Sequence, residues 1–209
     1  MKMNLANKLT VFRMILVPII ALVPVIDSLL ENGIPGEFLG ISTAFWIMNI
    51  IFIIASITDK LDGYIARSRN QVTTFGKFLD PLADKILVLA ALVILVEYAK
   101  IPAWIPIIVL AREFIVSGYR LLAVEKGGKV VAASFWGKLK TATTMVSIIL
   151  VFFDGYSFAD CFMKAELGMT TGAFVFNIIT TVMMSLSVIA TIFSGIDYLK
   201  DSKDLFKDA

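Results

Sequence analysis

Histidine is absent from the 209 residues, and cysteine occurs once, at Cys161. The first absence excludes a Ser-His-Asp triad, a histidine zinc site and a histidine general base. The second excludes an intrachain disulfide and a metal cluster built from cysteines. Any acid–base or metal chemistry must therefore come from aspartate, glutamate, lysine, arginine or tyrosine.

Charged residues are also scarce, at 17% of the chain, where a soluble globular domain has about 25%. Hydrophobic residues reach 58%, and the mean hydropathy is +0.87. These values predict an all-α membrane protein that crosses the bilayer several times. The chain is short enough to form a single membrane domain over residues 1–209.

Six apolar runs are long enough to cross the hydrocarbon core as helices, which takes about 20 residues each. The fifth is the weakest, because Asp154 and Gly155 favour an earlier end. We expect a bundle of six transmembrane helices, formed by Leu9–Leu30, Leu39–Thr58, Pro81–Ala99, Pro102–Val124, Thr141–Ala159 and Gly172–Ile196.

Lysine and arginine gather on one predicted side of this bundle. With six spans, both termini share a side with the connections 59–80 and 125–140. The opposite loops, near 27–38, 100 and 160–170, contain only Lys100 and Lys164 as cations. Because cytoplasmic loops carry the excess of lysine and arginine, we expect both termini to be cytoplasmic.

Four aspartates stand at the cytoplasmic ends of the second and third predicted spans. Spacings of three and four residues put each pair on one face of a helix. Carboxylates near hydrocarbon are costly and usually serve function, and two facing pairs would form an all-oxygen cage for divalent cations. The alternative is that they cap helices or pair with nearby lysines and arginines. The four are Asp59, Asp62, Asp80 and Asp84.

Small residues continue the first of these acidic faces. Gly63 and Ala66 follow Asp59 and Asp62 at helical spacing, which leaves room for a ligand beside the backbone. Arg67 comes next, and its guanidinium suits a bidentate contact with a phosphate.

At this point the residues carry a resemblance. The string Asp59-x2-Asp62-Gly63-x2-Ala66-Arg67-x8-Gly76-x3-Asp80-x3-Asp84 resembles the complete signature of the CDP-alcohol phosphotransferase family. The resemblance implies a membrane enzyme with six transmembrane helices, usually a homodimer. Such enzymes move a phosphatidyl or similar group from a CDP-linked donor to an alcohol and release CMP. It also implies two divalent cations, commonly Mg²⁺ or Mn²⁺, held by the four aspartates.

The resemblance also assigns roles to single positions. Asp59, Asp62 and Asp80 are the implied principal metal ligands, and Asp84 is the implied remaining ligand and general base toward the acceptor hydroxyl. The implied contacts to the CDP moiety are Asp62, Gly63, Ala66, Arg67 and Gly76.

Four cations outside the signature suggest the acceptor. Arg112 and Arg120 share a broad face of the fourth span, and Lys138 and Lys140 open the fifth at its cytoplasmic end. Their convergence would suit an acceptor that carries a phosphate monoester. The alternative is that the two lysines are ordinary positive-inside anchors. Arg112 lies inside an apolar run, where Glu113 would help to neutralise it.

Several strings resemble a bacterial branch of the family that uses sn-glycerol 3-phosphate as acceptor. This resemblance implies CDP-diacylglycerol as donor, membrane lipids as surroundings, no nucleic-acid partner, and a bacterial cytoplasmic membrane with the active site facing the cytoplasm. Cardiolipin synthases share some of these strings, so that activity stays open. The strings are Asn7-Lys8-Leu9-Thr10-x2-Arg13, Leu79–Lys85, Ala111–Phe114, Ser117–Arg120 and Gly137–Thr141.

A cation transporter or channel is the alternative from another class of protein. In that interpretation the four aspartates would form a transit site. The four aspartates cluster at one membrane boundary, however, and no further aspartate lies in the middle of a span to continue a path. The sequence therefore favours the enzyme.

Overall fold

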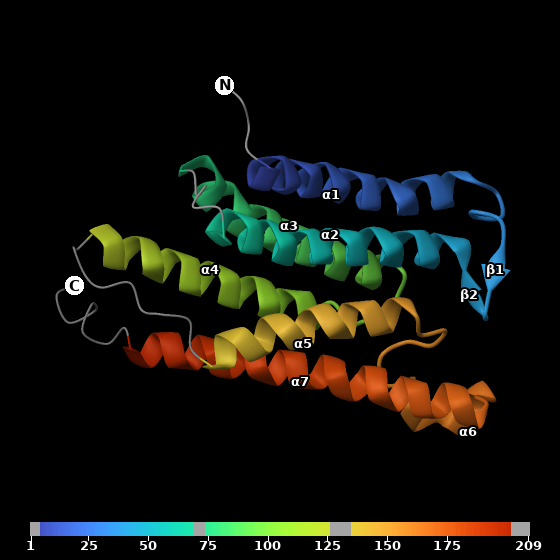
Figure 1. Ribbon diagram of the computed structural model, residues 1–209. Helices are drawn as coiled ribbons and strands as arrows, with labels where there is room; N and C mark the ends of the chain where they lie inside the picture. Colours follow the sequence, from blue (N-terminus) through green and yellow to red (C-terminus); the bar gives the residue numbers. More distant parts are fainter. Residues whose placement is uncertain (1–4, 69–73, 126–134, 202–209) are drawn as a thin grey trace. The chain divides into compact units, whose positions relative to one another are not determined.

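The computed structural model describes residues 5–68, 74–125 and 135–201 (Figure 1). Within these residues, six helices of 18 residues or more follow one another along the chain, which confirms the predicted helical order. A short hairpin of β1 (Glu37–Phe38) and β2 (Ile41–Ser42) follows the first helix, and η1 (Asp160–Met163) and α6 (Lys164–Leu167) precede the last. The long helices are α1 (Leu5–Leu29), α2 (Thr43–Ser68), α3 (Thr74–Glu97), α4 (Trp104–Glu125), α5 (Phe135–Phe152) and α7 (Thr171–Asp201).

Several helices extend beyond the apolar runs that predicted them. α2 continues ten residues past Thr58, and α3 begins seven residues before Pro81, so Gly76 lies in its first turn. α5 begins six residues before Thr141 and ends at Phe152, so both bounds of the predicted Thr141–Ala159 were wrong, although the earlier end that Asp154 and Gly155 favour is confirmed. Apolarity marks the part of a helix that suits hydrocarbon, whereas the helical hydrogen bonds are local and continue into polar sequence.

Three helices have the length and composition of membrane spans, among the residues searched: Asn7–Leu29, Phe135–Phe152 and Thr171–Lys200. The apolar part of α2, Thr43–Asp59, is shorter. α3 and α4 carry more charged residues: two aspartates, two lysines and a glutamate on α3, and two arginines and two glutamates on α4. These observations support a membrane protein.

The faces of α7 are reversed relative to a helix on a water-soluble protein. Its exposed face is apolar, with Val175, Val182 and Ile189, whereas its buried face carries Asn177 and Thr191 among other polar residues. A surface helix in water shows the opposite arrangement. In lipid, polar side chains turn to the protein interior, so this reversal is expected of a membrane helix.

The chain forms two compact units, and the first contains α1, α2, α3 and the end of α5. An aromatic cluster closes one end of this unit: the Phe45 ring lies 4.9 Å from Tyr98 and 6.0 Å from Phe152. The Tyr98 hydroxyl donates to the Asp27 carboxylate at 2.7 Å, which ties the end of α1 to the chain after α3. These contacts fix how the three helices line up.

The second unit contains α4, most of α5, η1, α6 and α7. α4 packs against α7. The Thr144 and Ser187 hydroxyls hydrogen-bond at 2.6 Å between α5 and α7, and the Trp136 and Phe193 rings stack at 4.9 Å. The helices of this unit are therefore joined by polar as well as apolar contacts.

Candidate active site

The four aspartates lie on α2 and α3, which pack against each other and are joined by only five residues. Helices with so short a connection run antiparallel. Asp62 and Asp80 each stand six residues from the connected helix ends, and Asp59 and Asp84 stand nine and ten residues away. At about 1.5 Å of rise per residue, the pairs stand at matching heights. The predicted helical phase of both pairs is confirmed.

A buried arginine from α1 contacts the first of these carboxylates. Arg13 Nη1 donates to Asp59 Oδ1 at 2.7 Å, and the side chains of Arg13 and Asp59 are 0% and 30% exposed. Removing one partner of a buried ion pair leaves an uncompensated charge and is strongly destabilising. The pair therefore anchors α1 to α2 beside the acidic face.

In the sequence analysis Arg13 has no role of its own, because it is the only arginine in the first apolar run. A usable signal was present. Asn7, Thr10 and Arg13 recur every three residues, and all three are buried in the structure. A polar stripe on an otherwise apolar membrane helix indicates that this face packs against a polar site.

Asp84, the implied base, lies at the edge of the packed core. Its neighbours on α3, Ala83 and Leu87, are completely buried, whereas Asp84 itself is half-buried. A base must be within reach of the hydroxyl that it deprotonates. The partial exposure of Asp84 is compatible with that role.

The implied CDP contacts are placed by the backbone of the two helices. Because α2 is continuous to Ser68, Gly63 and Ala66 lie on the same helical face as Asp59, and Arg67 also lies on this helix. The side chains of Asp62, Ala66, Arg67 and Asp80 lie outside the part of the chain that the structure describes at side-chain level.

The chemistry of the donor set fits a divalent cation. Mg²⁺ and Mn²⁺ prefer carboxylate oxygens, and the two adjoining helices supply four such groups at matching heights. Among the described side chains no group of three metal-binding residues is assembled, because only Asp59 and Asp84 of the four fall within that set.

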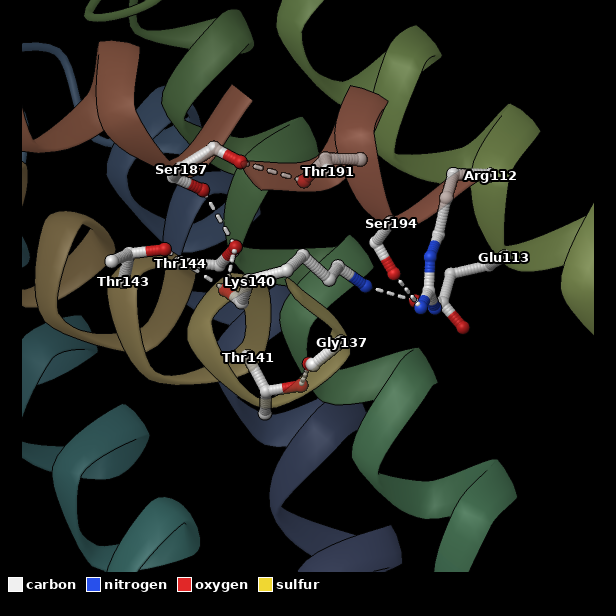
Figure 2. Close-up of polar contacts among 10 residues, drawn as sticks. All are labelled: Arg112, Glu113, Gly137, Lys140, Thr141, Thr143, Thr144, Ser187, Thr191 and Ser194. Atoms are coloured by element: carbon white, nitrogen blue, oxygen red, sulfur yellow. Dashed lines mark hydrogen bonds and ion pairs between the residues drawn. The ribbon is translucent and has the colours of Figure 1, made fainter. Parts of the chain in front are cut away.

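A second polar cluster lies in the second unit, on α4, α5 and α7 (Figure 2). Glu113 Oε1 accepts from Arg112 Nη1 at 3.2 Å and also from Lys140 Nζ. The Arg112, Glu113 and Lys140 side chains are 12%, 19% and 8% exposed. Arg112 Nη2 donates to Ser194 Oγ, and the guanidinium lies 5.6 Å from the centre of the Tyr198 ring. We call these five residues the cation cluster.

The cation cluster contains two of the four cations predicted to bind the acceptor, Arg112 and Lys140. Lys138, two residues from Lys140 on α5, is exposed. The side chain of Arg120 lies outside the described residues. The structure therefore brings Arg112 and Lys140 together at Glu113, and sequence reasoning did not foresee that one carboxylate joins them.

A row of hydroxyl groups adjoins Lys140 between α5 and α7 (Figure 2). The Thr144 hydroxyl donates to the Lys140 carbonyl at 2.7 Å and also pairs with Ser187. The Thr191 hydroxyl in turn donates to the Ser187 carbonyl at 2.7 Å. These hydrogen bonds satisfy polar groups in a buried place beside Lys140.

The chain matches the family model of CDP-alcohol phosphatidyltransferases over residues 3–194 and therefore belongs to that family. It is an enzyme of the transferase class that acts in phospholipid biosynthesis at a membrane. This confirms the resemblance carried by the aspartate signature.

Individual relatives are more specific. The chain is 49% identical, over 148 residues, to the CDP-diacylglycerol–glycerol-3-phosphate 3-phosphatidyltransferase of Bacillus subtilis (strain 168), covering 69% of this chain and 74% of the relative. It is 35% identical to the Haemophilus influenzae protein of the same name, covering 100% of this chain and 98% of the relative. A probable phosphatidylglycerophosphate synthase of Mycobacterium tuberculosis is 33% identical over 94% of this chain and 80% of the relative.

Proposed function

We propose that this protein transfers the phosphatidyl group of CDP-diacylglycerol to sn-glycerol 3-phosphate, giving phosphatidylglycerophosphate and CMP. The observation that carries the proposal is similarity along the whole chain to the Haemophilus influenzae protein named CDP-diacylglycerol–glycerol-3-phosphate 3-phosphatidyltransferase. The aspartate signature on α2 and α3 supports the transfer chemistry, and the cation cluster supports an acceptor that carries a phosphate.

The chemistry of the proposed reaction begins at the acceptor hydroxyl. Asp84 accepts the proton of the glycerol C1 hydroxyl, and that oxygen attacks the lipid-side phosphorus of CDP-diacylglycerol. A new oxygen–phosphorus bond forms, the diphosphate bond breaks, and the electron pair leaves with CMP. Arg67 pairs with the diphosphate, and Asp62, Gly63, Ala66 and Gly76 contact the CDP moiety.

Two divalent cations, Mg²⁺ or Mn²⁺, would be held by Asp59, Asp62, Asp80 and Asp84. When bound, they would neutralise negative charge on the diphosphate and on the departing CMP. Arg13 supports this acidic face through its contact with Asp59. Arg112, Arg120, Lys138 and Lys140 bind the phosphate of the acceptor, where arginine and lysine provide charge-assisted hydrogen bonds.

The proposal includes the topology and the assembly. The six long helices form one membrane domain over residues 1–209, with both termini and the active site facing the cytoplasm of a bacterial cell. The distribution of lysine and arginine supports this orientation. We also propose that two copies of the chain form a homodimer in the lipid membrane.

The test is a reconstituted reaction. Purified protein in detergent is given CDP-diacylglycerol, Mg²⁺ and labelled sn-glycerol 3-phosphate, and the labelled lipid and CMP are measured together. Equal amounts of both products are expected. If no labelled lipid forms, and the protein instead releases CMP when it is given inositol phosphate or phosphatidylglycerol as acceptor, it belongs to another branch of the family.

A further inference from the structure

A single carboxylate oxygen holds both buried cations of the cation cluster (Figure 2). Glu113 Oε1 accepts hydrogen bonds from Arg112 Nη1 on the same helix and from Lys140 Nζ on α5. Two positive charges this close repel each other, and the repulsion is stronger away from water. The shared oxygen therefore holds together two groups that would otherwise move apart.

The directions of the Arg112 and Glu113 side chains show that their contact does not follow from their adjacency on the helix. Neighbouring residues on a helix do not face each other, so Arg112 and Glu113 meet only because both side chains turn toward a common point. Glu113 also reaches from α4 to α5, where it contacts Lys140, one helical turn before Thr144. The carboxylate thus sets the relative positions of cations from two helices.

Arg112 is held on several sides and still has an unused donor. Ser194 accepts from Nη2, Glu113 accepts from Nη1, and the Tyr198 ring lies beside the guanidinium. Its Nε is buried and has no hydrogen-bond partner among the described residues. Leaving a buried donor without an acceptor is costly. The three contacts from α4 and α7 nevertheless hold the guanidinium in this place.

We infer that Glu113 is a positioning residue, which holds Arg112 and Lys140 at the separation that binds the phosphate of the acceptor. The inference rests on the proposed function, because it requires an acceptor with a phosphate monoester. Glu113 acts through the two cations and makes no contact with the substrate in this account. Its effect is to prepare the binding geometry before the acceptor arrives.

Whether phosphate binding weakens or strengthens when Glu113 loses its charge distinguishes a positioning role from a purely electrostatic one. Glu113 is itself an anion, so removing its charge would strengthen phosphate binding if long-range repulsion were decisive. Its Oε1 is shared by two cations, however, which offsets its charge toward an incoming phosphate. Loss of the fixed geometry is therefore expected to outweigh the loss of repulsion, and phosphate binding should weaken.

The experiment uses the full-length protein in detergent with CDP-diacylglycerol and Mg²⁺, and varies sn-glycerol 3-phosphate. Glu113→Gln keeps the shape and removes the charge, so KM for glycerol 3-phosphate should rise by about tenfold, with kcat changed by less than about threefold. KM for CDP-diacylglycerol should stay the same. Glu113→Asp keeps the charge and should restore part of the affinity. The matched control is Glu166→Gln, which alters an exposed glutamate on α6 and should change nothing.

A double-mutant cycle supplies the second measurement. Once Lys140→Met has removed one of the two cations, adding Glu113→Gln should raise KM by much less than it does alone, because the two changes affect one interaction. Full additivity would contradict the inference, as would a KM for glycerol 3-phosphate that is unchanged or lower in Glu113→Gln. A variant that only lowers kcat and the unfolding temperature would show a structural role and would also overturn it.

The outcomes distinguish the two proposals. If the unaltered protein uses glycerol 3-phosphate and the Glu113 variants behave like the control, the positioning role fails alone. If the unaltered protein makes no phosphatidylglycerophosphate, the proposed function fails, and the positioning role fails with it.

Discussion

The two polar clusters of this protein have opposite compositions. On α2 and α3, four aspartates form an acidic face, and among the described side chains a buried cation, Arg13, contacts one of them, Asp59. In the cation cluster, the excess is positive, and a single carboxylate, Glu113, contacts Arg112 and Lys140. In each cluster, the residue whose charge is in the minority connects two helices. Arg13 connects α1 to α2, and Glu113 connects α4 to α5.

The sign of the excess indicates the ligand that each cluster suits. Surplus carboxylates favour divalent cations, and surplus guanidinium and ammonium groups favour phosphates. The minority charge stabilises the partners that it contacts, because an isolated buried charge is far costlier than a paired one. In the proposed mechanism the majority charges bind the metal ions and the phosphate, and the minority charges support them.

The largest effect is expected at the acidic face. Asp84→Asn removes the proposed base and should lower kcat by about 10²–10⁴-fold, the usual contribution of a positioned general base. Steady-state CMP release measures the loss, and thermal unfolding in detergent should show little change. Asp160→Asn, in the η1 segment, is the control and should keep full activity. Equal losses in both variants would mean that Asp84 has no special role.

The next largest effect is expected from replacing Arg13, which tests whether the cation beside Asp59 supports the acidic face. Arg13→Met leaves Asp59 without its cation, so the protein should unfold at a lower temperature. Activity should fall about 10–100-fold, as is common when a residue that orients a metal ligand is lost, because Asp59 is a proposed ligand. Excess Mg²⁺ should recover part of the thermal stability, because added cations can neutralise the carboxylates.

Two comparisons check the Arg13 result. Arg13→Lys keeps the charge without the planar guanidinium and should fall between the unaltered protein and Arg13→Met. A thermal midpoint of Arg13→Met that does not respond to Mg²⁺ would argue against Asp59 as a metal ligand.

The cation cluster should respond more selectively. Lys140→Met removes a buried cation held by Glu113 and should raise KM for glycerol 3-phosphate by about tenfold, with KM for CDP-diacylglycerol unchanged. Lys138→Met alters an exposed lysine two residues away and should have a smaller effect. If the exposed lysine matters more, phosphate binding does not centre on the Glu113 pair.

The smallest effect is expected at the uncharged hydrogen bond between Thr144 of α5 and Ser187 of α7. Thr144→Val removes the hydrogen bond to Ser187 and should lower the free energy of unfolding by about 0.6 kcal/mol, the average for hydrogen bonds between membrane helices. Thr141→Val, in an exposed position on the same helix, should be neutral. Both are measured by denaturation in detergent. A large loss of acceptor affinity in Thr144→Val would show that this turn also controls Lys140.

Much of the arrangement could be predicted because it depends on local sequence. Apolar runs gave the order of the helices, and spacings of three and four residues gave the common face of each aspartate pair. The end of α2 at Ser68 and the start of α5 at Phe135 could not be predicted from the sequence in this way. Hydropathy reports where the hydrocarbon boundary lies and not where the helical hydrogen bonds begin or end.

The supporting residues could not be predicted because they depend on tertiary contacts. Nothing local indicates that Arg13 meets Asp59 from 46 residues away. The expected Arg112–Glu113 contact is confirmed, but the second partner of Glu113, Lys140, lies on another helix and was not expected. Majority charges were therefore visible as sequence motifs, whereas the full set of contacts of the minority charges became visible only in the fold.

The most direct test of the account compares two acceptors that differ only by a phosphate. CMP release from CDP-diacylglycerol is measured with Mg²⁺ and equal concentrations of glycerol or sn-glycerol 3-phosphate. Rapid release is expected with glycerol 3-phosphate and little with glycerol, because in the proposed mechanism the cation cluster binds the phosphate. Equal rates with the two acceptors would contradict it.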